Sequence, residues 1–118
     1  MIHGVGIEIV DIERFRLVME RGGQRFLERL FTRSELDYCM RQRRPHEHLA
    51  ARFAAKVSVI KAAGAALSLR VRDIEVVRGA GNRPEVRVTG LCTGFTVAVS
   101  ISHDGGLGVA QAIIEMQG

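Results

Sequence analysis

The segment "AARFAAKVSVIKAAG" (residues 50–64) decides the fold, because it predicts a long helix packed in the core of the protein. Apolar residues recur at the three- and four-residue spacing of one helix face, which predicts a buried stripe. The residues of this stripe are Leu49, Phe53, Val57 and Ile60. The same helix carries Lys56 and Lys61, the only lysines in the chain, and their presence in an apolar segment needs an explanation.

Helical spacing gives the two lysines different neighbours. Residues four apart share a face, so Val57 lies beside Lys61, while Arg52 lies beside Lys56 on an adjoining face. A buried ammonium without a partner is costly, so we expect Lys61 to face solvent, a carboxylate or a phosphate. Two interpretations stay open: both lysines extend along the surface to reach water, or Lys61 binds an anion.

The N-terminal residues predict a strand followed by a helix. In "HGVGIEIV" (residues 3–10) Val5, Ile7 and Ile9 alternate with small or polar residues, which predicts a strand with that apolar face buried and Glu8 pointing away from it. In "DIERFRLVMERG" (residues 11–22) apolar residues recur at helical spacing, with Asp11 as the N-cap and Gly22 as the stop.

A second helix is predicted before the long one. Thr32 and Glu35 form a capping box, and Phe31 and Leu36 occupy the positions of a hydrophobic staple. After a basic stretch, Pro45 interrupts the pattern, and the long helix is expected to begin near His48.

The C-terminal half predicts two hairpins. "DIEVVRGAGNRPEVRV" (residues 73–88) has turn residues at "GAGN", and "FTVAVSISHDGGLGVAQAII" (residues 95–114) has them at "HDGG". With a strand and helices first and antiparallel strands after them, residues 1–118 predict one α+β domain.

Composition narrows the class of protein. The net charge is +4 and the cations are almost all arginine, which indicates either an acidic partner or simply a solvated basic surface. The acidic partner would be nucleic acid, a phosphorylated small molecule or an acidic protein. Aromatic residues are only 5% of the chain and there is no tryptophan or nucleic-acid-binding motif, which argues against nucleic acid. No apolar run of about 18 residues indicates a membrane span, and the N-terminus lacks the pattern of a signal peptide, so we expect a cytoplasmic protein. Cys39 and Cys92 are expected to be reduced packing residues rather than ligands.

Three positions besides the lysines are candidates for chemistry. His103 and Asp104 end a predicted strand, where a histidine beside a carboxylate can orient a substrate, accept a proton or bind phosphate. The alternative is that Asp104 only opens the turn and His103 caps it. Glu8 lies on the face of its strand opposite the apolar row, where it is either a metal ligand or simply solvated.

Five blocks in order carry a resemblance to a known family: "GVGIEIVDIERF", "FLERLFTRSELDYC", "LAARFAAKVSVIKAAG", "GNRPEVRVTG" and "VSISHDGGLGVA". The chain closely resembles the holo-[acyl-carrier-protein] synthases, the small bacterial 4'-phosphopantetheinyl transferases. The resemblance implies transfer of phosphopantetheine from coenzyme A to a serine of apo acyl carrier protein, with release of 3',5'-ADP, in fatty acid biosynthesis. It also implies a magnesium cofactor and a homotrimer with active sites between subunits.

The resemblance assigns roles to particular residues. It implies that Lys61 faces the phosphates of coenzyme A during transfer, that Glu8 holds magnesium, and that Asp104 or a metal-bound water takes the proton from the serine. It places coenzyme A against Arg44, Arg52, Asn82, Pro84, Lys61 and His103. The acidic carrier protein would dock on the arginines of the first helix, which are Arg14, Arg21 and Arg25.

Two positions depart from the family pattern. Glu8 stands where the family has aspartate, and Val57 stands where it has the second metal-binding glutamate. Valine cannot coordinate magnesium, which requires oxygen ligands. Two hypotheses follow: magnesium binds through Glu8, pyrophosphate and water, with help from Asp104, or the chain is an impaired homologue that binds coenzyme A or carrier protein without efficient transfer.

Overall fold

The computed structural model describes residues 1–91 and 93–117 and has the predicted α+β architecture. Cys92 lies outside the described residues. The elements are β1 (Ile2–Asp11), α1 (Ile12–Leu30), α2 (Arg33–Met40), α3 (Pro45–Leu67), η1 (Val71–Asp73), β2 (Ile74–Arg78), η2 (Ala80–Asn82), β3 (Pro84–Val88), β4 (Phe95–Asp104) and β5 (Leu107–Met116).

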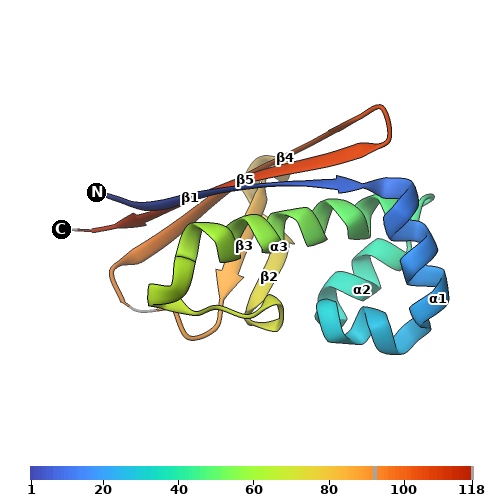
Figure 1. Ribbon diagram of the computed structural model, residues 1–118, viewed down its shortest axis with the longest axis horizontal. Coiled ribbons are helices and arrows are strands. Elements are labelled where there is room, and N and C mark those ends of the chain that lie inside the picture. The colour runs from blue at the N-terminus through green and yellow to red at the C-terminus, as the bar shows by residue number, and fades with distance from the viewer. Residues whose placement is uncertain (92, 118) are drawn as a thin grey trace.

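The strands form two antiparallel sheets. One has the order β1-β5-β4 and the other is the β2–β3 hairpin, and both predicted hairpins are confirmed. Helix α3 lies along one face of the larger sheet, with α1 and α2 at one end of the molecule (Figure 1). The β2–β3 hairpin packs beside α3 and against β4. Among the described residues no helix is long and apolar enough to cross a membrane.

Glycines in β1 let α3 lie close to the sheet. A Cβ atom at Gly6 would come within 1.9 Å of the Ser58 carbonyl oxygen, and one at Gly4 within 2.0 Å of the Ala62 carbonyl oxygen. The helix therefore packs against strand backbone, at a separation that no side chain at either glycine would allow.

This packing reverses the predicted orientation of β1. Val5, Ile7 and Ile9, expected in the core, are 53%, 56% and 60% exposed. The alternation of apolar and small residues is present, but the buried face carries the glycines, and the apolar row stays exposed among residues 1–91 and 93–117. Glu8 points away from that row, as predicted, and therefore toward α3.

Helix α3 begins at Pro45 rather than near His48. Proline suits the first turn, where a backbone N–H has no helical partner, so Pro45 starts the helix instead of interrupting it. The predicted stripe is only partly correct: Leu49 is fully buried, whereas Phe53, Val57 and Ile60 are half-buried. The innermost face of α3 consists mainly of alanines, and Val59 and Lys56 lie among them. The buried alanines are Ala50, Ala54, Ala55, Ala62 and Ala63.

The first helix is longer than predicted. Asp11 caps it, with its side chain accepting from the Arg14 N–H at 2.9 Å, as expected. Gly22 does not end it: the backbone kinks at Gly23, whose φ of 63° is in the left-handed region, and helix resumes to Leu30. In the sequence the adjacent Gly22 and Gly23 indicate the end of a helix, although helical structure continues after them to Leu30.

The capping box of α2 is confirmed, and Glu35 does more than cap. It accepts from the Thr32 N–H at 2.8 Å and the Val76 N–H at 2.8 Å, and it pairs with Lys56 at 2.5 Å. The interpretation of both lysines as surface residues is therefore wrong for Lys56, which is 0% exposed. Cys39 is also buried, as a packing residue should be.

Candidate functional site

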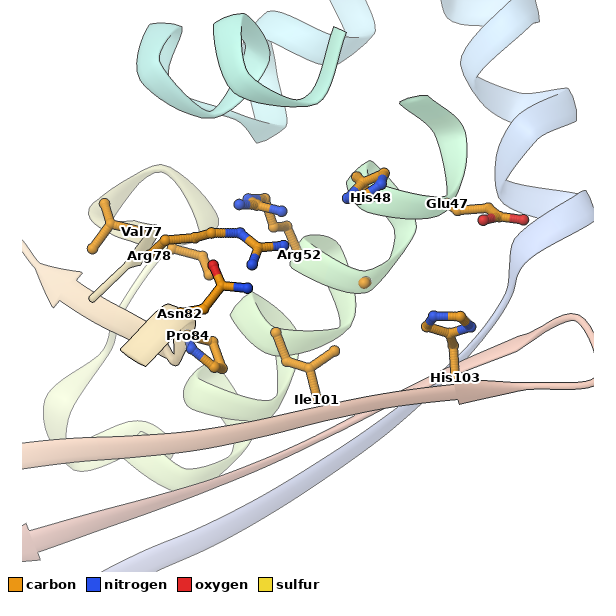
Figure 2. Close-up of a pocket in the computed structure, with 11 residues that line it drawn as sticks. Glu47, His48, Arg52, Val77, Arg78, Asn82, Pro84, Ile101 and His103 are labelled. Atoms are coloured by element: carbon orange, nitrogen blue, oxygen red, sulfur yellow. The ribbon is translucent and has the colours of Figure 1, made fainter. Parts of the chain in front are cut away.

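A cleft of about 240 Å³ opens between the first turns of α3, the β2–β3 hairpin and β4. Figure 2 shows side chains from all three elements turned into it. Its lining residues are Glu47, His48, Ala51, Arg52, Val76, Val77, Arg78, Asn82, Pro84, Ile101 and His103.

The cleft brings together four of the six residues predicted to contact coenzyme A. Arg52 comes from α3, Asn82 and Pro84 from the hairpin turn and the start of β3, and His103 from β4. Asn82 has a positive φ of 64°, a conformation that asparagine tolerates better than most residues, so the turn geometry presents its amide to the cleft. These residues come from three separate parts of the sequence, which the fold brings together.

Arg52 is the least solvated cation of the cleft. It is 7% exposed, and its Nε atom is buried without a hydrogen-bond partner among the described residues. Its guanidinium carbon lies 4.6 Å from the centre of the Tyr38 ring. A buried donor without an acceptor is costly, so an anionic ligand that accepts a hydrogen bond from Arg52 would bind favourably here.

Lys61 and Glu8 form a second group, which is not part of the cleft lining. The Lys61 ammonium donates to Glu8 Oε1 at 2.7 Å and to the Ile7 carbonyl at 3.1 Å. The predicted alternative of a carboxylate partner for Lys61 is therefore confirmed. Val57 lies one turn earlier on the same helix face and adds no oxygen there.

Arg44 and Asp104 are also outside the cleft lining. Arg44 is exposed before α3 and lies 3.4 Å from Glu47. Asp104 pairs with Leu107 at the end of β4, next to the pair His103–Gly108. Because side chains alternate along a strand, Asp104 points to the uncovered face of the sheet, opposite to the face of Glu8 and His103. Within a single chain, Asp104 therefore lies on the other side of the sheet from Lys61 and Glu8.

The residues near Lys61 do not make a magnesium site by themselves. Of the predicted contributors Glu8 and Asp104, only Glu8 lies near Lys61, and its Oε1 atom accepts from the Lys61 ammonium. The described residues contain no cluster of three side chains of the types that hold a metal ion. A magnesium ion here would need oxygen ligands from the substrate phosphates or water in addition to Glu8.

The electrostatic environment of the cleft is positive. Burial lowers the pKa of His48, and the nearby charges of Arg52 and Arg78 lower it further, whereas Glu47 opposes them. His48 is therefore neutral at pH 7, since the pKa of a free histidine is already about 6.5.

Three contributors to the cleft were missed by sequence reasoning: His48, Tyr38 and Arg78. His48 and Arg78 line it, and the Tyr38 ring packs against both Arg52 and Arg78. Arg78 ends β2 opposite Pro84 of β3, and this pairing places it beside a predicted cleft residue.

Comparison with known proteins agrees with this architecture. The family model of the 4'-phosphopantetheinyl transferase superfamily matches residues 4–113. The holo-[acyl-carrier-protein] synthase of Geobacter sulfurreducens is 42% identical, over 98% of both chains. The crystal structure of the Neisseria meningitidis holo-[acyl-carrier-protein] synthase superposes with a TM-score of 0.84 at 29% identity, covering 98% of this chain and 99% of that one.

A third similar protein has been solved with a ligand. The holo-(acyl-carrier-protein) synthase from Bacillus anthracis, in complex with CoA (3',5'-ADP), has a TM-score of 0.81 and 32% identity over 99% of both chains. The fold and cleft thus define a transferase of the phosphopantetheinyl class. The chain belongs to the 4'-phosphopantetheinyl transferase superfamily, and the predicted family and α+β fold are confirmed.

Proposed function

We propose that this chain transfers the 4'-phosphopantetheine group of coenzyme A to a serine of apo acyl carrier protein. The observation that carries the proposal is the cationic cleft, which joins Arg52, Asn82, Pro84 and His103 in a fold shared with a relative solved in complex with CoA (3',5'-ADP). We retain the predicted setting, fatty acid biosynthesis in the cytoplasm, as part of the proposal.

In this reaction the serine oxygen attacks the phosphorus that bears pantetheine. A new phosphorus–oxygen bond forms, the pyrophosphate bond breaks, and its electron pair leaves on 3',5'-ADP. An ammonium group has three N–H donors, of which Lys61 uses two within the chain, so one remains for a phosphate oxygen. Lys61 would thereby stabilise charge that develops on the pyrophosphate.

The metal and the general base remain predictions. Magnesium would be held through Glu8 and the substrate's own phosphates, since this ion commonly uses one or two carboxylates and keeps several waters. The serine proton would pass to Asp104 or to a water held by the metal. Asp104→Ala should slow turnover, and unchanged turnover would exclude Asp104 as the base; Glu8→Gln should raise the magnesium concentration needed for half-maximal activity.

The uncovered sheet face supports the predicted homotrimer. Val5, Ile7 and Ile9 form an exposed apolar row on β1, and Asp104 ends β4 on the same face of the sheet. A neighbouring subunit on this face would bury the row and bring Asp104 to an interface. Ile7→Arg should reduce the molar mass measured by light scattering, and a monomeric unaltered chain would contradict the trimer.

The carrier protein would dock on α1. Arg14, Arg21 and Arg25 are all exposed, and Leu17 and Val18 beside them are 49% and 44% exposed. Cations around an apolar patch suit an acidic protein surface. Arg14→Glu should weaken carrier-protein affinity without changing coenzyme A affinity, with Arg87→Glu on β3 as the control; equal loss of both affinities by Arg14→Glu would contradict the assignment.

A second candidate function rests on Val57. In this candidate, valine one turn before Lys61 removes transfer activity, and the chain binds coenzyme A or carrier protein without efficient transfer. The deciding experiment incubates the chain with coenzyme A, magnesium and apo acyl carrier protein and follows the intact mass of the carrier, with Val57→Glu in parallel.

We expect the unaltered chain to add phosphopantetheine. If only Val57→Glu adds it, the second candidate is correct and residue 57 alone has silenced the reaction. If neither protein modifies the carrier and neither binds coenzyme A or the carrier protein, both candidate functions are wrong.

A further inference from the structure

Two arginine side chains converge on one aromatic ring at the edge of the cleft. The guanidinium carbon of Arg52 lies 4.6 Å from the centre of the Tyr38 ring, and that of Arg78 lies 5.2 Å from it. Figure 2 shows the two guanidinium groups approaching each other from α3 and from the hairpin, with the Asn82 amide beside them. The ring holds both cations in place, although their charges repel each other.

No carboxylate neutralises this pair. Among the described residues, neither Arg52 nor Arg78 takes part in an ion pair, and the buried Nε of Arg52 has no acceptor at all. Glu47 is the acidic residue that lines the cleft, and it lies 3.4 Å from Arg44 instead. Two fixed guanidinium groups without a counter-charge therefore form a site for an anion.

The position of Arg78 is fixed by the surrounding structure. Its pairing partner across the hairpin is Pro84, and the turn is closed by the Gly79 N–H, which donates to the Arg83 carbonyl at 2.8 Å. Two residues earlier, the Val76 N–H donates to the buried Glu35 carboxylate at 2.8 Å. The strand that carries Arg78 is thus anchored at both ends of this short segment.

The charge of the site selects among phosphate groups. A phosphomonoester carries between one and two negative charges at neutral pH and has three terminal oxygens, whereas each phosphate within a pyrophosphate diester carries one charge. Two guanidinium groups can bind the monoester with bidentate hydrogen bonds from both sides. We propose that Arg78, together with Arg52, binds the 3'-phosphomonoester of the nucleotide substrate and makes Arg78 a specificity-determining residue. This inference rests on the proposed function.

The experiment compares two nucleotides that differ only in this group. Titration calorimetry with magnesium present measures the affinity of the full chain for coenzyme A and for dephospho-coenzyme A, which lacks the 3'-phosphate. Arg78→Gln removes the charge at an exposed strand end, where folding should be little affected. Arg87→Gln makes the same change of charge on β3, outside the cleft lining, and serves as the matched control.

We expect Arg78→Gln to weaken coenzyme A binding by about tenfold to a hundredfold, the loss typical of a hydrogen bond to a charged group. Dephospho-coenzyme A binding should change by less than about twofold, and Arg78→Lys should lie between Arg78→Gln and the unaltered chain. Equal weakening of both nucleotides, or none, would overturn the assignment of Arg78 while the proposed function stands. If the unaltered chain binds neither nucleotide, the proposed function and this inference both fail.

Discussion

Helix α3 carries two lysine–glutamate pairs that differ chiefly in their exposure to water. Lys56 and Glu35 lie 2.5 Å apart with side chains 0% and 1% exposed, whereas Lys61 and Glu8 lie 2.7 Å apart with side chains 53% and 25% exposed. Nearly the same contact therefore exists in two dielectric environments. The first pair belongs to the core, and the second is available to a ligand.

The buried pair connects four segments. Lys56 also donates to the Leu30 carbonyl at 2.7 Å, and Glu35 accepts from the backbone of Thr32 and Val76. The end of α1, the start of α2, the middle of α3 and strand β2 thus meet at one ion pair. Burial lowers the pKa of Lys56, and Glu35 opposes that shift by stabilising the charged ammonium.

The largest effect is expected on breaking the buried pair. Lys56→Met leaves the Glu35 carboxylate buried without its counter-charge, and removal of one partner of a buried ion pair typically costs about 3–5 kcal/mol. Urea unfolding followed by circular dichroism measures the loss in the free energy of unfolding. Lys61→Met is the matched control, and its cost should stay below about 1 kcal/mol because the second pair is solvated.

A second variant separates charge from packing. Adding Glu35→Gln to Lys56→Met removes the orphaned charge and keeps one acceptor oxygen for one of the two neighbouring N–H groups, so it should restore part of the lost stability. Equal costs for Lys56→Met and Lys61→Met would show that burial does not distinguish the two pairs.

For activity we expect the larger loss from Lys61→Met, whereas for stability we expect it from Lys56→Met. Lys61→Met should lower the turnover of phosphopantetheine transfer by about a hundredfold, comparable with removal of one charge-stabilising donor from an active site. Intact mass of the carrier protein, sampled over time, measures the rate, and an unchanged melting temperature shows that folding is intact. Turnover within about threefold of the unaltered chain would mean that Lys61 only pairs with Glu8.

The positions of helices and strands were predicted more reliably from the sequence than the face that each element buries. The capping box at Thr32, the cap at Asp11 and both hairpins depend on local rules, and all are confirmed. The buried faces of β1 and α3 depend on packing: Gly4 and Gly6 allow close approach of the helix, which turns the apolar row of the strand outward.

The candidate site shows the same division. Arg52, Asn82, Pro84 and His103 were predicted through the resemblance to the family and do line one cleft. Arg78 could not be found in this way, because its role depends on the Tyr38 ring, which a different element supplies. Local spacing carries no information about such a contact between α2 and β2.

The smallest expected effect tests the dielectric difference directly. Charges at the surface are screened within about 10 Å at 0.1 M salt and about 3 Å at 1 M, whereas buried charges are screened much less. The few tenths of a kcal/mol lost in Lys61→Met should therefore disappear in 1 M sodium chloride. The larger loss in Lys56→Met should persist, because no salt ions reach the Glu35 carboxylate. Unfolding free energies of both variants at the two salt concentrations give the comparison, and a salt-dependent cost for Lys56→Met would show that water and ions penetrate to the buried pair.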